Sequence, residues 1–190
     1  QEGKKVKVGH TGTLDPFATG LMILVTGKEC RNAGVYTKLD KVYEATLVLG
    51  QESTTGDPEG TLTTIVGQIP TQEEVAAALV AFTGEIRQRP PIFSAIKIAG
   101  QRAYKLARDG KEIEMPERMV KVYSLELLEY AYPELRVRTH VSSGTYIRSL
   151  AVDIGQALGT GAYCSQLRRT KIAEWSVNGA QTLADFGIDD

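Results

Sequence analysis

Cysteine is scarce in this chain, and long apolar runs are missing from it. Cys30 and Cys164 are the two cysteines among 190 residues, and their separation fits neither a disulfide framework nor a metal site. We therefore expect free thiols in a reducing cytoplasm and no bound metal. No apolar run approaches the roughly 18 residues of a membrane-spanning helix, and residues 1–7 are polar, with no signal-peptide stretch. These features predict a cytoplasmic protein without a membrane segment.

The charge of the chain is nearly balanced overall but unevenly distributed. The formal net charge is −1, which by itself gives no sign of a nucleic-acid partner. Residues 1–41, 85–108 and 142–172 nonetheless carry seven, six and four Lys or Arg residues against four, one and one acidic residues. Convergence of these segments on one face would provide a surface for a polyanion, whereas scattered, solvated charge is the alternative.

The pattern of apolar residues predicts one α+β domain. Residues 41–49, 119–130 and 134–141 are strand-like, and residues 92–98 and 173–177 are extended. Thr71 and Glu74 form a capping-box pattern ahead of apolar residues at helical spacing, and Gly84 is placed to end that helix. Further helices are expected over residues 102–108 and from residue 142 to Gly159. Because strands and helices do not alternate regularly, we expect a mixed, mainly antiparallel sheet with flanking helices rather than a doubly wound fold.

The first segment that could carry chemistry is residues 8–20, VGHTGTLDPFATG. Three glycines, three threonines, a histidine and Asp15 lie between a basic lead-in and the apolar residues 21–25. Small residues let a backbone approach a ligand closely, and Asp15 is a single carboxylate among hydroxyl groups. The alternative is a turn or N-cap aspartate before Pro16. The segment is not a phosphate-binding P-loop, because no Gly-Lys-Ser/Thr follows at the required spacing.

Two later segments carry cations. Arg148 in SSGTYIR lies at the start of a mainly apolar helix, where a buried cation needs an anionic partner, either a carboxylate or a ligand phosphate. The alternative is a surface arginine in the first helical turn. The cluster LRRTK at residues 167–171 suits phosphate contacts but is weak evidence by itself.

Together, four segments in order resemble the bacterial-type TruB family of tRNA pseudouridine-55 synthases, over nearly the whole chain. They are GHTGTLDPFATGLM at 9–22, KVYEATLVLG at 41–50, RPPIFSAIKIAGQRAYKLARDG at 89–110 and SSGTYIRSLAVDIGQALGTGAYCSQLRRT at 142–170. The resemblance implies the pseudouridine synthase fold and an isomerase that acts on the T-loop uridine of tRNA without a cofactor or metal.

The resemblance also implies residue roles. Asp15 falls at the catalytic aspartate, Tyr43 at a tyrosine that stacks on the target base and removes the C5 proton, and Arg148 at the arginine that pairs with the aspartate. Leu167 falls at an apolar residue against the uracil, and His10 at a histidine that contacts RNA near the flipped nucleotide. Further substrate contacts are expected at Thr11, Gly12, Lys97, Arg168 and Arg169.

The chain departs from the family pattern at both ends. Family members usually begin with a strand that precedes Gln1 of this chain, and most carry a small C-terminal RNA-binding (PUA) domain. We therefore expect a single catalytic domain over residues 1–190, with the N-terminal strand missing from its sheet and no PUA domain. We also expect a monomer.

The implied reaction breaks the N1–C1′ bond of uridine and rejoins uracil through C5. Ionised Asp15 would act either as a nucleophile at C1′ or as a base at C2′ that gives a glycal, and the sequence does not separate these routes. One alternative is a catalytically idle tRNA-binding or tRNA-folding protein on the same scaffold, and another is a synthase for ribosomal or RNA-guided targets. A glycosidase with paired carboxylates is less favoured, because no second acid lies near Asp15 in the sequence.

Overall fold

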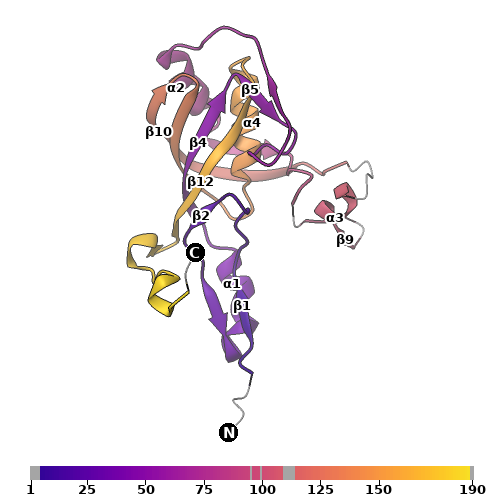
Figure 1. Ribbon diagram of the computed structural model, residues 1–190, viewed down its shortest axis with the longest axis vertical. Coiled ribbons are helices and arrows are strands. Elements are labelled where there is room, and N and C mark those ends of the chain that lie inside the picture. Colours follow the sequence, from indigo (N-terminus) through magenta and orange to yellow (C-terminus); the bar gives the residue numbers. More distant parts are fainter. Residues whose placement is uncertain (1–4, 95, 99, 109–113, 189–190) are drawn as a thin grey trace.

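The computed structural model describes residues 5–94, 96–98, 100–108 and 114–188. Within these residues a seven-stranded sheet forms the centre of the molecule (Figure 1). Its strand order is β13 (Trp175–Ser176), β12 (Ala162–Ile172), β4 (Lys41–Leu49), β11 (Glu134–Val141), β10 (Arg118–Ala131) and β7 (Gly84–Gln88), and β2 (Thr19–Gly20) pairs in parallel with β12. The other strand pairs are antiparallel, which confirms the expected mixed, mainly antiparallel sheet.

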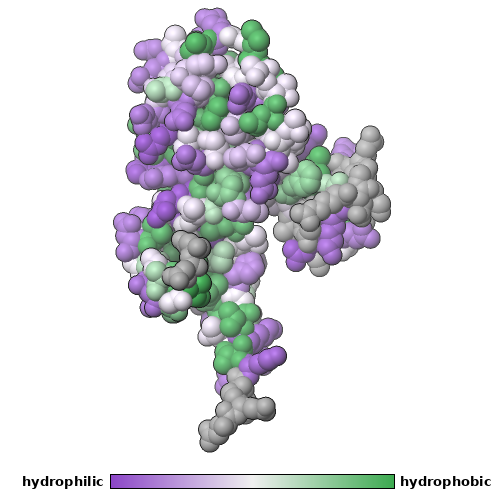
Figure 2. All heavy atoms as spheres, viewed as in Figure 1, coloured by the Kyte–Doolittle hydropathy of each residue, from purple (hydrophilic) through white to green (hydrophobic). Residues whose placement is uncertain are grey.

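Smaller elements extend from this body. Strand pairs form between β1 (Val8–His10) and β3 (Leu24–Thr26), β5 (Gln51–Ser53) and β6 (Leu62–Thr64), and β8 (Lys97–Ile98) and β9 (Gln101–Arg102). The short helices are α1 (Ala33–Thr37), α3 (Ala103–Arg108) and three 3-10 segments, Gly27–Asn32, Val177–Gly179 and Ala184–Phe186. Figure 1 shows the arm of β1, β3 and α1 extending beyond one end of the sheet, and α3 projecting to the side. Hydrophobic side chains gather where the arm joins the body (Figure 2).

Two longer helices, α2 (Gln72–Ala81) and α4 (Ile147–Ala157), pack against the same sheet core. Side chains alternate across a strand, so Ala45, Leu47 and Leu49 of β4 share the face that meets these helices. Ile154 of α4 is fully buried against them, and Leu47 is 1% exposed. None of the helices in the described part of the chain is long and apolar enough to cross a membrane.

The helix predicted from Thr71 is confirmed. The Thr71 hydroxyl accepts a hydrogen bond from the Glu74 N–H at 3.2 Å, and the Glu74 carboxylate accepts one from the Thr71 N–H at 2.7 Å. This reciprocal pair satisfies two backbone donors that the first helical turn leaves free.

The structure departs from the sequence-based predictions at α4 and at β12. Helix α4 begins at Ile147 and not at Ser142, because residues 142–145 form a turn in which the Thr145 hydroxyl donates to the Ser142 carbonyl at 2.9 Å. The long strand β12 was not predicted at all. Bulges at Cys164/Gln166 and Arg169/Lys171 interrupt its alternation, and the charged Arg169 occupies an inward position.

Candidate active site

The structure brings together two side chains that are 133 residues apart, those of Asp15 and Arg148. The Arg148 Nε donates to Asp15 Oδ2 at 2.9 Å, and Nη2 donates to Oδ1 at 3.1 Å. This is a bidentate pair, which fixes orientation as well as charge. The Arg148 side chain is 3% exposed, whereas the Asp15 side chain is 30% exposed. The guanidinium is therefore buried behind a carboxylate that solvent can reach.

Every N–H group of the Arg148 guanidinium has an acceptor. Nη1 donates to the Thr55 carbonyl at 3.1 Å and to Asp57 Oδ2 at 3.0 Å, and Nη2 also donates to the Phe93 carbonyl at 2.9 Å. With the two bonds to Asp15, these contacts use all five donors that an arginine side chain has. The guanidinium is thus held from three separate loops and cannot rotate without losing a bond.

Asp57 is a functional candidate that the sequence did not reveal. Its side chain is 5% exposed, its Oδ2 pairs with Arg148, and its Oδ1 accepts from the Thr55 hydroxyl at 2.5 Å and from the Glu59 N–H at 3.0 Å. In the sequence it lies in the turn-rich stretch TTGDPEG, where an aspartate before proline is expected as a turn residue. No local signal separates that role from an ion pair with a residue 91 positions away.

The loop that carries Asp15 is fixed by β12. Arg169 is 2% exposed, and its Nε donates to the Leu21 carbonyl at 2.7 Å while Nη2 donates to the Gly12 carbonyl at 3.1 Å. The Leu21 N–H donates in return to the Arg169 carbonyl at 2.8 Å. At Gly20 a Cβ atom would lie 2.2 Å from the Arg169 carbonyl oxygen, so only glycine allows this close approach.

Two predicted substrate contacts lie in positions that support the loop. Arg169 is turned into the protein, and its guanidinium holds the Asp15 loop through backbone carbonyls. Thr11 is 2% exposed, and its hydroxyl donates to the Ile23 carbonyl at 3.3 Å, within the same loop. Gly12 belongs to this supporting network through its carbonyl and has a positive φ of 144°.

Tyr43 and Leu167 lie on the face of the sheet that carries Arg169. In the pairing of β4 with β12, Tyr43 is opposite Arg169, and Ala45 is opposite Leu167. Burial raises the pKa of the half-buried Tyr43 phenol, and the nearby Arg169 guanidinium opposes that rise. Leu167 is 7% exposed and lines a cavity of about 410 Å³ together with Phe17, which follows Asp15 in the loop.

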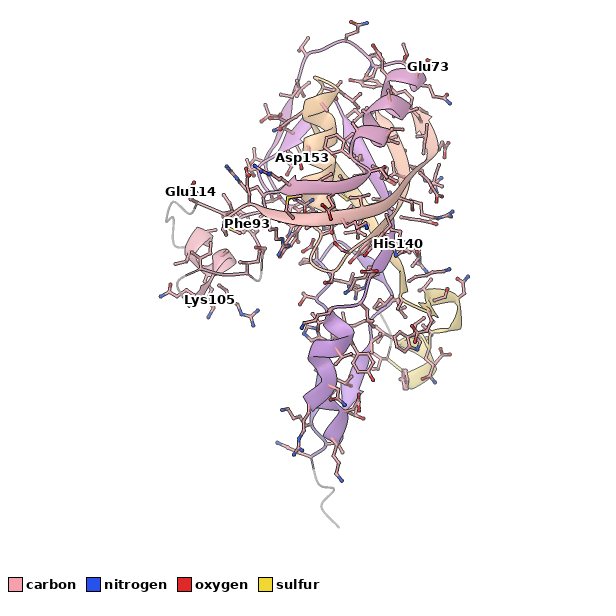
Figure 3. All side chains as sticks on the ribbon, turned by 180° about the vertical axis from the view of Figure 1, so that it is seen from behind. Glu73, Phe93, Lys105, Glu114, His140 and Asp153 are labelled. Carbon is pink, nitrogen blue, oxygen red and sulfur yellow. The ribbon has the colours of Figure 1, made fainter. Side chains whose placement is uncertain are left out.

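The remaining predicted contacts are dispersed. His10 is exposed on β1 in the N-terminal arm, and Arg168 is exposed on β12. Lys97 belongs to β8, but its side chain lies outside what the structure describes. Figure 3 shows Phe93 near the base of the projection that carries Lys105. In the described residues there is no group of three or more His, Cys, Asp or Glu side chains that could hold a metal ion.

A second cavity of about 670 Å³ borders Arg148 on the side of α4 and β7. Its lining includes Phe93, Arg87 and Asp153. Figure 3 shows Asp153 on α4. Burial raises the pKa of the Asp153 carboxyl to about 6.

Two family models together match nearly all of the chain. The model described as "TruB family pseudouridylate synthase (N terminal domain)" matches residues 2–147, and "tRNA pseudouridylate synthase B C-terminal domain" matches residues 148–187. The tRNA pseudouridine synthase B of Aromatoleum aromaticum is 46% identical over 177 residues, which are 93% of this chain and 58% of that protein. That of Parabacteroides distasonis is 46% identical over 188 residues, which are 98% of this chain and 79% of that protein. The chain thus spans 58% to 79% of the length of these relatives.

Solved structures resemble the fold. A chain of the "Crystal Structure of a Cbf5-Nop10-Gar1 Complex" is 33% identical with a TM-score of 0.67, covering 90% of this chain and 41% of that one. A chain of the "Structure of H/ACA RNP bound to a substrate RNA containing 2'-deoxyuridine" is 28% identical with a TM-score of 0.67, covering 97% of this chain and 48% of that one. These comparisons confirm the fold and the family resemblance inferred from the sequence motifs.

Proposed function

Because the chain belongs to the TruB family of pseudouridylate synthases, we propose that it converts a T-loop uridine of tRNA to pseudouridine, with Asp15 as the catalytic carboxylate. The observation that carries this proposal is the bidentate pair between Asp15 and Arg148, buried on the arginine side and open on the aspartate side. The pair leaves the Asp15 carboxylate oriented and within reach of a ligand.

The reaction that we propose is redox-neutral. The N1–C1′ bond breaks with its electron pair going to uracil, the base turns, a C5–C1′ bond forms, and the C5 proton is lost as N1 regains one. The Asp15 carboxylate serves either as a nucleophile whose bond to C1′ breaks again when C5 attacks, or as the base that removes the C2′ proton to give a glycal and returns it when the C5–C1′ bond forms. The partly exposed Asp15 carboxylate is compatible with both routes, because each needs one carboxylate oxygen facing the ribose.

Tyr43 is proposed to stack on the uracil and to take up the C5 proton. Burial raises the pKa of its phenol, and the Arg169 guanidinium beside it opposes that rise, so Arg169 assists proton transfer through this hydroxyl. Base stacking on an aromatic ring contributes about 1–3 kcal/mol. Leu167 supplies an apolar contact on the same face.

The target uridine must leave the folded T-loop to reach Asp15. Unstacking costs a few kcal/mol, which contacts to phosphates and to the pocket have to offset. Exposed cations such as Arg168, Lys7 and Lys105 are available for such contacts. We therefore propose the T-arm of tRNA as the partner and a monomer as the working form.

The test is to incubate the chain with an unmodified tRNA transcript and a metal chelator and then to map pseudouridine. Conversion at one T-loop uridine is expected, and Asp15→Asn should abolish it while RNA binding persists. Binding without conversion by the wild-type chain would favour the idle-scaffold alternative and overturn the proposal. Conversion by Asp15→Asn at the wild-type rate would refute the role of Asp15.

A further inference from the structure

The start of helix α4 is held by a side chain from a distant strand. Tyr146 is the N-cap residue of α4, and its own side chain makes no capping hydrogen bond. Instead, the Oε1 of Gln88 accepts from the Tyr146 N–H at 2.7 Å, and the Nε2 of Gln88 donates to the Tyr146 carbonyl at 2.9 Å. Gln88 is 1% exposed. One buried side-chain amide therefore satisfies both backbone groups of the residue that opens the helix.

A second tie joins the same two elements. The Ser149 hydroxyl donates to the carbonyl of Arg89, the residue after Gln88, at 2.8 Å. Gln88 and Arg89 thus hold residues 146 and 149, on either side of Arg148. Farther along the same segment, the Phe93 carbonyl accepts from the Arg148 guanidinium itself.

The position of Gln88 is itself fixed by the sheet. Gln88 pairs with Arg118 at the end of the β7–β10 ladder, so its backbone is anchored where its side chain meets α4. The Arg118 guanidinium lies 4.9 Å from the centre of the Tyr146 ring and donates to the Gly144 carbonyl. Side chains from both strands, Gln88 of β7 and Arg118 of β10, therefore hold the turn before α4.

We propose that Gln88 is a positioning residue for the reaction: by fixing the first turn of α4, it sets the orientation of Arg148 and, through it, that of the Asp15 carboxylate. This inference rests on the proposed function. A shift or rotation of α4 would move the guanidinium away from a bidentate geometry that has no spare donor. Misplacement of a reacting group by about 1 Å can cost roughly a hundredfold in rate.

The main test compares Gln88→Ala with Gln72→Ala, which removes an exposed glutamine on α2. Pseudouridine formation is followed in single turnover with protein in excess over tRNA transcript, alongside RNA affinity and thermal unfolding. For Gln88→Ala we expect a rate constant reduced about a hundredfold at saturation, with unchanged RNA affinity. Gln72→Ala should match the wild type. A folded Gln88→Ala that turns over at the wild-type rate, or that loses only affinity, would overturn the inference.

Gln88→Glu separates positioning from general packing and serves if Gln88→Ala does not fold. The introduced carboxylate still accepts from the Tyr146 N–H but cannot donate to the Tyr146 carbonyl until it is protonated. The rate of this variant relative to the wild type should therefore rise as the pH is lowered. A ratio that stays constant with pH would contradict the proposed donor role. Ser149→Ala removes the hydrogen bond to the Arg89 carbonyl. It should lower the rate constant less than Gln88→Ala does, and an unchanged rate would contradict a role for this hydrogen bond in holding α4.

Nuclear magnetic resonance of the arginine Nε–H groups gives a readout that does not depend on turnover. The Arg148 signal is assigned by its loss in Arg148→Lys. It should exchange slowly with solvent in the wild type and in Gln72→Ala, and faster in Gln88→Ala. If the wild type makes no pseudouridine, the proposed function fails while this comparison still decides the role of Gln88. An unchanged signal in Gln88→Ala would refute the positioning role.

Discussion

Asp57 lies 3.0 Å from Nη1 of Arg148, away from the Nε and Nη2 atoms that bind Asp15. One guanidinium is therefore shared by two carboxylates, one buried and one partly exposed. This arrangement makes Asp57 the part of the site most easily tested without touching Asp15.

We expect Asp57→Ala to destabilise the fold by about 1–3 kcal/mol, because it removes the carboxylate that accepts from the Thr55 hydroxyl and leaves one N–H of Arg148 without a buried partner. Turnover should also fall, since Arg148 loses one of its fixed contacts. Urea unfolding and single-turnover assays measure the two effects. Glu126→Ala, at a distant and exposed ion pair, provides the control and should change stability little. Wild-type stability in Asp57→Ala would show that the pair contributes nothing.

Tyr43→Phe keeps the ring and removes the hydroxyl. We expect RNA affinity to stay close to that of the wild type, because stacking needs only the ring, while the rate of product formation falls by roughly 10²–10⁴-fold if the hydroxyl moves the C5 proton. Release of tritium from C5-labelled uridine in the transcript follows this step directly. Unaltered tritium release would reduce Tyr43 to a packing residue.

Arg168 and Arg169 are neighbours with different expected effects. Arg168→Ala removes an exposed cation, so the slope of log affinity against log salt should become shallower by about one unit if it contacts a phosphate. Arg169→Ala removes the side chain that holds the Asp15 loop, so it should lower both stability and turnover. Identical effects of the two substitutions would contradict the inward placement of Arg169.

Asp153 should make stability depend on pH. Burial raises its folded-state pKa from 3.8 to about 6, so the folded state binds this proton more tightly than the unfolded state does. The stabilisation that comes from this bound proton is therefore fully present below about pH 4 and is lost as the pH rises through about 6. Asp153→Asn should stabilise the protein at pH 7 by about 1–2 kcal/mol, after allowance for partial exposure, and by nothing near pH 3.5. Urea unfolding at both pH values tests this, with Glu85→Gln at an exposed position as control. An equal gain at both pH values would exclude titration as the cause.

Local patterns predicted the parts of the fold that local interactions determine. The capping box at Thr71, the apolar run of β4 and the alternation of β11 depend on near neighbours and on which face is buried. The start of α4 was placed too early, because the Ser142 hydroxyl accepts from the Lys121 N–H at 2.9 Å, which ties it to the sheet instead of capping the helix. Whether Ser142 caps the helix thus depends on a residue in a strand, Lys121, that lies 21 positions away in the sequence.

The same contrast applies to the site. The motif around Asp15 and the helix at Arg148 indicated two residues of the candidate site, and the family resemblance implied that they pair. Asp57 and Gln88 were missed because each acts through contacts 91 and 58 residues distant, with no periodicity or charge run to mark it. The burial of Arg169 was not predictable either, because a basic cluster normally faces solvent, whereas here backbone carbonyls accept from its guanidinium.

The complete set of acceptors around Arg148 has a consequence for how substrate meets this site. No donor of that guanidinium is left to recruit an incoming phosphate or carbonyl, so arrival of the nucleotide need not rearrange it. The energetic cost of gathering two carboxylates around one cation is met when the polypeptide folds. Under the proposed function, this guanidinium is already in place when the target nucleotide is turned out of its RNA loop.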